Sequence, residues 1–258
     1  MDHLSRTNHH SRPHMRVLVI PCFNEEHRII ESEVLRCVEI LQCTVLLVDD
    51  GSRDNTLNAL NAIASLQPDL IRVHHLAKNV GKGEAVRSGV QLAMSLGATE
   101  VGFCDADFSV DAVDLLRLFS HLDSSPQLDA VIGSRMAISG STIERSFIRH
   151  IFGRIFATLV TFTLRQRFYD TQCGAKVFRT NSVVQEAFSW PFISRWAFDV
   201  EVIGRIQRNK KNQTGPVSIA EIPLQRWIAQ PGSKLSFVQQ FKTVLDLVRI
   251  RRSLQKLK

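Results

Sequence analysis

Two apolar segments of this chain run directly into acidic residues. Residues 45–48 (VLLV) are followed by Asp49 and Asp50, and residues 101–104 (VGFC) by Asp105 and Asp107. Short apolar runs of this kind are typical of strands buried in a parallel sheet. Because ligands of such sheets bind beyond the carboxyl ends of the strands, the two acidic groups are expected to form one site there.

The rest of the pattern alternates short β-branched runs with longer amphipathic segments. Strands alternating with helices of ten or more residues indicate an α/β fold built on a doubly wound, mostly parallel sheet. At 258 residues the chain is long enough for one such domain with a sizeable core. The sequence predicts strands at 16–21, 44–48, 70–75, 100–104 and 130–133, and helices at 25–41, 54–66, 83–96 and 111–121.

The two ends of the chain and the segment after residue 140 have a different character. Residues 1–14 are polar and rich in His and Arg, without the apolar region of a signal peptide, and are predicted to be a disordered extension. Residues 147–168 are apolar but rich in arginine, and residues 237–258 are also basic and amphipathic. Both are predicted to lie on an anionic membrane surface as helices; the alternative is a packed helix whose arginines extend to water.

The net charge of +7 calls for a polyanionic partner, which is a nucleic acid, an anionic membrane or a phosphorylated ligand. A nucleic-acid-binding module is disfavoured because the basic residues are not interleaved with aromatics in a recognised module. The five cysteines form no C-x-x-C pair. They are typical of reduced core thiols in a cytosolic compartment.

Two loop motifs follow predicted strands and could hold a nucleotide. P-C-F-N-E-E at 21–26 offers an aromatic ring and a carboxylate, although a plain turn capped by Asn24 is the alternative. K-N-V-G-K-G at 78–83 opens a helix whose N–H groups could meet phosphate. Neither G-x-x-x-x-G-K-[ST] nor G-x-G-x-x-G occurs, which disfavours a P-loop ATPase and a dinucleotide-dependent enzyme.

Two further segments are expected to reach the same edge. Gly133-Ser134-Arg135 brings a guanidinium suited to bidentate binding of phosphate oxygens, with a surface ion pair as the alternative. Residues 169–179 (YDTQCGAKVFR) are polar and framed by apolar runs. They are predicted to form a loop that packs back against the site.

Together these motifs resemble the family 2 inverting glycosyltransferases, which have the nucleotide-diphospho-sugar transferase (GT-A) fold. The match runs from about residue 16 to 236, within a domain placed at 15–236 and followed by the helix at 237–258. Inside the family the chain most resembles the dolichyl- and polyprenyl-phosphate glucosyl- and mannosyltransferases. The motifs occur in the family's order: P-C-F-N-E-E, V-D-D-G-S-R-D, N-V-G-K-G-E-A, D-A-D, G-S-R, D-T-Q-C-G-A-K-V-F-R and W-A-F-D-V-E.

The resemblance implies a role for individual residues. Asp105 and Ala106 would border the sugar diphosphate, and Asp107 would be the main ligand of Mg²⁺ or Mn²⁺. The second metal-contacting position, often Gln in mannosyltransferase relatives, is Ser109 here. The nucleotide pocket would be lined by Pro21, Phe23, Glu25, Val48 and Asp50, and phosphate would be bound by Arg135, Arg149 and, from a late loop, Lys234.

The implied reaction transfers a hexose from a nucleoside-diphosphate sugar to a polyprenyl monophosphate, with inversion, at the cytoplasmic face of a membrane. D-T-Q-C-G and W-A-F-D-V-E favour UDP-glucose over GDP-mannose as the donor. The alternative within the family is a soluble saccharide or protein acceptor, which would need a carboxylate base such as Asp199 or Glu201. A sugar-nucleotide pyrophosphorylase is disfavoured because no glycine-rich G-x-G-T-R loop follows the first strand.

Overall fold

The computed structural model describes residues 14–144, 147–212, 219–228 and 237–256, with the backbone alone at 144, 147–152, 210–212 and 237–242. The elements are β1 (Arg16–Cys22), α1 (Glu31–Leu41), β2 (Thr44–Asp49), α2 (Thr56–Leu66), β3 (Ile71–His75), α3 (Lys82–Ser95), β4 (Glu100–Cys104), α4 (Ala112–Asp123), β5 (Ala130–Ser134), β6 (Thr142–Glu144), α5 (Phe147–Leu164), β7 (Ala175–Arg179), α6 (Ser182–Ser189), α7 (Phe198–Asn212), β8 (Ile219–Pro223), β9 (Arg226–Ile228) and α8 (Phe237–Lys256).

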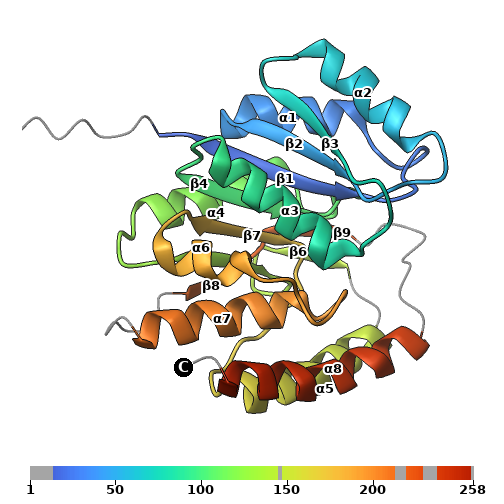
Figure 1. The fold of residues 1–258 in the computed structure, drawn as a ribbon. Helices are drawn as coiled ribbons and strands as arrows, with labels where there is room; N and C mark the ends of the chain where they lie inside the picture. Colours follow the sequence, from blue (N-terminus) through green and yellow to red (C-terminus); the bar gives the residue numbers. More distant parts are fainter. Residues whose placement is uncertain (1–13, 145–146, 213–218, 229–236, 257–258) are drawn as a thin grey trace, which may run out of the picture.

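The central sheet has the strand order β3-β2-β1-β4-β7-β5-β8 (Figure 1). All neighbouring strands in it are parallel except at β7, which runs antiparallel to both β4 and β5. The predicted α/β fold with a mostly parallel sheet is therefore confirmed. In the register Cys104 lies opposite Ala175, so β7 begins at the edge where β4 ends.

Each face of the sheet is covered by its own hydrophobic core. Residues of α1, α2 and α4 pack on one face, and residues of α3, α5, α6, α7 and α8 on the other. The strands supply fully buried Val, Leu and Ile to both cores, as the apolar runs predict. This arrangement leaves the carboxyl ends of the parallel strands clear of either layer.

The C-terminal helix α8 packs into the second core and lies beside α5 below α7 (Figure 1). Leu247, Ile250 and Leu254 of α8 are buried. Gly204 of α7 permits the contact, because a Cβ at that position would collide with the Leu254 side chain. Among the described helices, none combines the length and the apolar character needed to cross a bilayer.

Two sequence-based predictions are wrong in detail. The helix expected at 25–41 begins at Glu31, because Ile30 has an extended backbone (φ −108°, ψ 107°) that separates the helix from a turn in which the N–H groups of Arg28 and Ile29 donate to the Glu25 carbonyl. The loop expected at 169–179 ends at Gly174, and the remaining residues form the buried strand β7. Lys176, the second residue of this strand, hides it in the sequence pattern, since a lysine is seldom fully buried.

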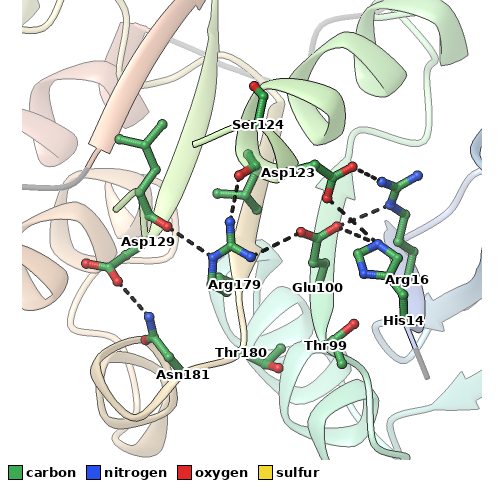
Figure 2. A network of polar contacts seen from close by, with 12 residues as sticks. His14, Arg16, Thr99, Glu100, Asp123, Ser124, Asp129, Arg179, Thr180 and Asn181 are labelled. Carbon is green, nitrogen blue, oxygen red and sulfur yellow. Dashed lines mark hydrogen bonds and ion pairs between the residues drawn. The ribbon is translucent and has the colours of Figure 1, made fainter. Parts of the chain in front are cut away.

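At the opposite edge of the sheet, Glu100 at the start of β4 forms a charged network (Figure 2). Its carboxylate lies 3.1 Å from Arg16 Nε, 3.2 Å from His14 Nε2 and 3.7 Å from Arg179 Nη1. Arg16 also pairs with Asp123 at the end of α4. The network joins β1, β4, β7 and α4. The pKa of Glu100 is raised to about 7, chiefly by burial and also by the hydrogen bond and charge of Asp123, against the opposing effect of Arg16.

This shift makes the stability of the fold depend on pH. Between about pH 4.5 and pH 7 the folded protein holds a proton on Glu100 that the unfolded chain releases, so the free energy of unfolding falls as the pH rises through that range. Urea denaturation of the wild type and of Glu100→Gln from pH 4.5 to 8 measures this. The variant is expected to show the shallower slope below pH 7, and equal slopes would contradict the assignment.

Candidate active site

The candidate site lies at the carboxyl edge of the sheet, where the D-A-D motif after β4 meets the segment that leads into β7; the acidic end of β2 lies on the same edge, on the other side of β1. The Asp105 N–H donates to the Gly174 carbonyl at 3.1 Å, which ties the end of β4 to this segment. A Cβ on Gly174 would collide with the Asp105 carboxylate, so the glycine lets that carboxylate lie directly against the chain. Asp105 is thereby held in place by the chain beside it.

Lys82, at the first position of α3, reaches across to the D-A-D motif. Its Nζ lies 2.6 Å from Asp105 Oδ1, and both side chains are partly exposed. Burial alone would lower the pKa of Lys82, but Asp105, Asp199 and Asp107 outweigh it and raise the value. The lysine therefore stays charged. Its ammonium group neutralises Asp105, one of the two carboxylates of the motif.

Asp107, the predicted main metal ligand, points to the surface. Its Oδ1 accepts the Ser109 N–H at 3.0 Å, and its Oδ2 lies 3.9 Å from Arg28 Nη2. Phe108 between them has a φ of +48°, an unusual conformation for a non-glycine residue that is enriched at functional sites. Asp107 and Ser109 line a cavity of about 140 Å³, together with Ile30, Glu33, Arg36, Phe108, Asp111, Arg226 and Ile228.

The donor atoms at this corner suit a hard divalent cation. Carboxylate oxygens of Asp105 and Asp107 are ligands that Mg²⁺ and Mn²⁺ accept readily. Asp105 is already balanced by Lys82, whereas Asp107 borders the cavity with a partly exposed carboxylate. The residues therefore fit a metal held chiefly by Asp107, with Ser109 on the rim of the same cavity.

The predicted nucleotide-pocket residues gather at the ends of β1 and β2. Pro21 and Phe23 are partly exposed, and Val48 is fully buried beneath them in β2. Glu25 is nearly buried; its N–H donates to Thr56 Oγ1 at 2.8 Å, and its carboxylate lies 3.4 Å from Arg28 Nε. Ala106, predicted to border the diphosphate, is buried between the two aspartates of the motif.

Asp50 is turned into the protein and does not face solvent. Its carboxylate accepts hydrogen bonds from Val80 N at 2.7 Å, Gly81 N at 2.9 Å and Asn79 Nδ2 at 2.9 Å. Burial raises the pKa of Asp50, while the bonds from Val80 and Gly81 oppose that shift. The structure gives Asp50 the role of holding the 79–81 loop, and a direct contact with the nucleotide stays a prediction.

Arg135 is held in a bidentate ion pair by Asp170. Its Nε and Nη2 lie 2.6 and 2.8 Å from the two carboxylate oxygens, and its backbone N–H also donates to Asp170 at 3.2 Å. Its guanidinium lies 5.3 Å from the ring centre of Trp227. Burial alone would lower the pKa of Arg135, but Asp170 outweighs it and raises the value. Asp170 opens the D-T-Q-C-G motif, but the sequence assigns it no role of its own and does not indicate its ion pair with Arg135.

Asp199 and Glu201, the candidate bases for a soluble acceptor, are both buried and paired. Asp199 is 5% exposed and lies 2.6 Å from the Nζ of Lys176, which is itself 0% exposed. Glu201 is 1% exposed and lies 2.6 Å from Arg205 Nη2. Burial raises the pKa of both carboxyls, while the partner cation in each pair opposes that shift.

The side chains of two predicted phosphate ligands lie outside the described part of the chain. Arg149 falls in the first turn of α5, where only the backbone is described, and Lys234 lies beyond the described residues altogether. Lys82, in contrast, belongs to a predicted phosphate loop, but the sequence does not indicate its contact with Asp105. Arg28 falls within a predicted helix, and nothing in the sequence marks it as a neighbour of Asp107.

The buried pair beneath the site predicts a large stability effect. Lys176→Met leaves Asp199 buried without its cation and is expected to lower the free energy of unfolding by about 3–5 kcal/mol. Urea denaturation measures this loss. Lys176→Met combined with Asp199→Leu removes both charges and is expected to recover most of it. A single variant as stable as the wild type would contradict the pairing.

Comparison with known proteins places the chain among nucleotide-sugar enzymes. Residues 17–186 match the family described as glycosyl transferase family 2. The dolichyl-phosphate beta-glucosyltransferase of Homo sapiens is 34% identical over 253 residues, which cover 91% of this chain and 74% of the relative. The protein of the same name from Saccharomyces cerevisiae is 31% identical, over 91% and 73% of the two chains.

Solved structures share the fold. Glucosyl-3-phosphoglycerate synthase from Mycobacterium tuberculosis, solved with Mn²⁺, UDP and glucosyl-3-phosphoglycerate, has a TM-score of 0.67 at 16% identity, over 94% of this chain and 80% of that one. Mannosyl-3-phosphoglycerate synthase from Rubrobacter xylanophilus has a TM-score of 0.65 at 17% identity, over 94% and 74%. The predicted GT-A fold is confirmed by these likenesses.

Proposed function

The chain belongs to glycosyltransferase family 2, and on that premise we propose that it transfers glucose from UDP-glucose to a polyprenyl monophosphate of the dolichyl type, with inversion. The similarity to dolichyl-phosphate beta-glucosyltransferases over 91% of the chain supports the sugar and the acceptor. The identity of the nucleotide, UDP, is supported by the D-T-Q-C-G and W-A-F-D-V-E motifs.

The burial of Asp199 and Glu201 is the observation that carries the choice of acceptor. A sugar or protein hydroxyl must lose a proton as it attacks, so its enzyme needs a carboxylate or other base that can reach it. Here both candidate carboxylates are closed off from solvent and bound to Lys176 and Arg205. A lipid phosphate has a second pKa of about 6 and is already largely ionised near neutral pH. It needs to be oriented rather than deprotonated.

The charges at the site suit the binding of two anionic reactants. The metal, Mg²⁺ or Mn²⁺, would be held by Asp107 beside Asp105, and when bound it supplies Lewis-acid stabilisation of the departing diphosphate. Lys82 supplies a fixed positive charge next to Asp105. Arg135, oriented by Asp170 and Trp227, is proposed to bind phosphate, and Arg149 and Lys234 keep the same predicted role.

Removal of the Asp107 carboxylate tests the proposed centre. Asp107→Ala is expected to lower the turnover of UDP-glucose with a polyprenyl phosphate by at least ~10²–10³, because a charge-stabilising group is lost. The side chain is partly exposed, so folding should be unaffected. The matched control is Asp69→Ala, an exposed aspartate between α2 and β3. Wild-type activity in Asp107→Ala would contradict the assignment of this residue.

The helices α5 and α8 are proposed to rest on an anionic membrane surface. They lie side by side, and each exposes large apolar side chains: Ile155 and Phe162 one heptad apart on α5, Leu245 and Val248 one turn apart on α8. Exposed basic residues accompany them, namely Arg165, Arg167, Arg249, Arg251 and Arg252. Apolar side chains flanked by cations are the composition of an interfacial helix. Such a surface would bring the site to a lipid-borne phosphate.

Flotation with liposomes tests this surface. The protein is expected to float with vesicles that contain anionic lipid and to be released by salt, at ~1 kcal/mol for each well-placed cation. Phe162→Ser should weaken flotation, because Phe162 is 65% exposed on α5. Leu66→Ser is the control, since Leu66 is 52% exposed on α2 in the other core layer. Failure of the wild type to float even at low salt would argue against the proposal.

A further inference from the structure

The loop between α6 and α7 carries Arg195 to the edge of the candidate site and holds it there. The buried Ser194 hydroxyl accepts hydrogen bonds from Trp196 N at 3.3 Å and Ala197 N at 2.9 Å. The Arg195 carbonyl accepts the Gly83 N–H at 3.3 Å, at the start of α3. The backbone at Arg195 is thus fixed to the start of α3, within a loop whose own turn before α7 is held by Ser194.

The side chain of Arg195 crosses directly over Gly81. A Cβ on Gly81 would lie 2.8 Å from Cγ and 2.9 Å from Cδ and Nε of the arginine. Gly81 also has a φ of +97°, a conformation that side chains other than glycine rarely adopt. Arg195 Nη2 donates to the Asn79 carbonyl at 3.4 Å. The absence of a side chain on Gly81 therefore leaves room for the aliphatic part of Arg195 to lie between the 79–81 loop and solvent.

Arg195 differs from the other described cations of the site in its partners. Arg28, Lys82 and Arg135 each have a carboxylate within 4 Å. Within the described ranges, no carboxylate lies at that distance from Arg195, and its side chain is exposed. Asp50, the acidic group behind it, already accepts three hydrogen bonds from the 79–81 loop. A positioned guanidinium is left with N–H donors that can meet a ligand.

We propose that Arg195 binds phosphoryl oxygens in this site, on the donor diphosphate or on the lipid monophosphate. The inference rests on the proposed function for the identity of these two ligands. Guanidinium groups bind phosphate through paired N–H donors, and a group already fixed in place loses little entropy when it binds. Lys82, one residue after Gly81, is paired with Asp105. Lys82 and Arg195 thus both lie at the start of α3.

The test compares Arg195→Gln with Arg72→Gln, an exposed arginine on β3. The glutamine introduced by Arg195→Gln keeps most of the stem over Gly81 and an amide donor toward Asn79, but it lacks the charge. Calorimetry with UDP and Mn²⁺ is expected to show binding weaker by about ten- to a hundredfold in Arg195→Gln and unchanged in Arg72→Gln. Arg195→Lys keeps the charge but lacks the paired N–H donors of a guanidinium, so its affinity for UDP should lie between those of the other two variants. An intermediate affinity would show that the loss in Arg195→Gln does not come from misfolding.

The same variants distinguish the donor diphosphate from the lipid monophosphate as the ligand of Arg195. If UDP binding is unchanged but the KM for farnesyl phosphate rises by about tenfold or more, Arg195 binds the acceptor phosphate. If both UDP affinity and that KM stay within about twofold of the Arg72→Gln values, Arg195 only clamps the loop and the proposal is overturned. UDP binding needs no acceptor, so the calorimetric test of the donor-diphosphate role stands even if the proposed function fails and the wild type does not use farnesyl phosphate.

Discussion

The site depends on the fully buried contact between Lys176 and Asp199. Lys176 Nζ lies 2.6 Å from Asp199 and donates to the Cys173 carbonyl at 2.6 Å, so it joins strand β7, helix α7 and the segment before β7. From that segment Asp170 holds Arg135, and the Gly174 carbonyl holds Asp105. Burying either charge at this depth without its partner would cost several kcal/mol, about 3–5 kcal/mol when one partner of a buried pair is removed. The pair therefore fixes the segment that holds Arg135 and Asp105.

The antiparallel direction of β7 explains why this is possible. A parallel strand between β4 and β5 would begin at the far edge of the sheet and bring nothing to the site. Because β7 runs the other way, its first residue lies opposite Cys104, and the polar segment before it reaches the D-A-D motif. The result is an alternating set of charges, in which Lys82 balances Asp105 and Asp170 balances Arg135. Asp107 is left at the cavity, where a metal can bind without displacing a buried partner.

The sequence predicts the parallel part of this structure well and the antiparallel part poorly. The strand at 100–104 and the acidic motif after it are found as predicted, since an apolar run that ends in carboxylates is typical of a buried strand that stops at a polar edge. Strand β7 was missed because Lys176 interrupts its apolar pattern, and its buried partner Asp199 is distant in sequence. The roles of Arg28 and of Asp170 in its motif were missed for a related reason: they come from contacts across the fold. The hold of Asp50 on the 79–81 loop is not indicated by the sequence, because that loop comes from beyond β3; its contact with the nucleotide stays a prediction.

The most direct test of the proposed reaction is the release of nucleoside diphosphate from a panel of sugar nucleotides, with Mg²⁺ or Mn²⁺, in the presence and absence of a polyprenyl monophosphate. The expected result is release of UDP from UDP-glucose that depends on the lipid phosphate. The rate is also expected to be level above about pH 7, where the acceptor phosphate is already ionised and no protein base must titrate. Release of UDP that does not depend on the lipid phosphate, or transfer to a soluble hydroxyl acceptor, would contradict the proposed acceptor. Such a reaction would require a base that the buried Asp199 and Glu201 do not provide.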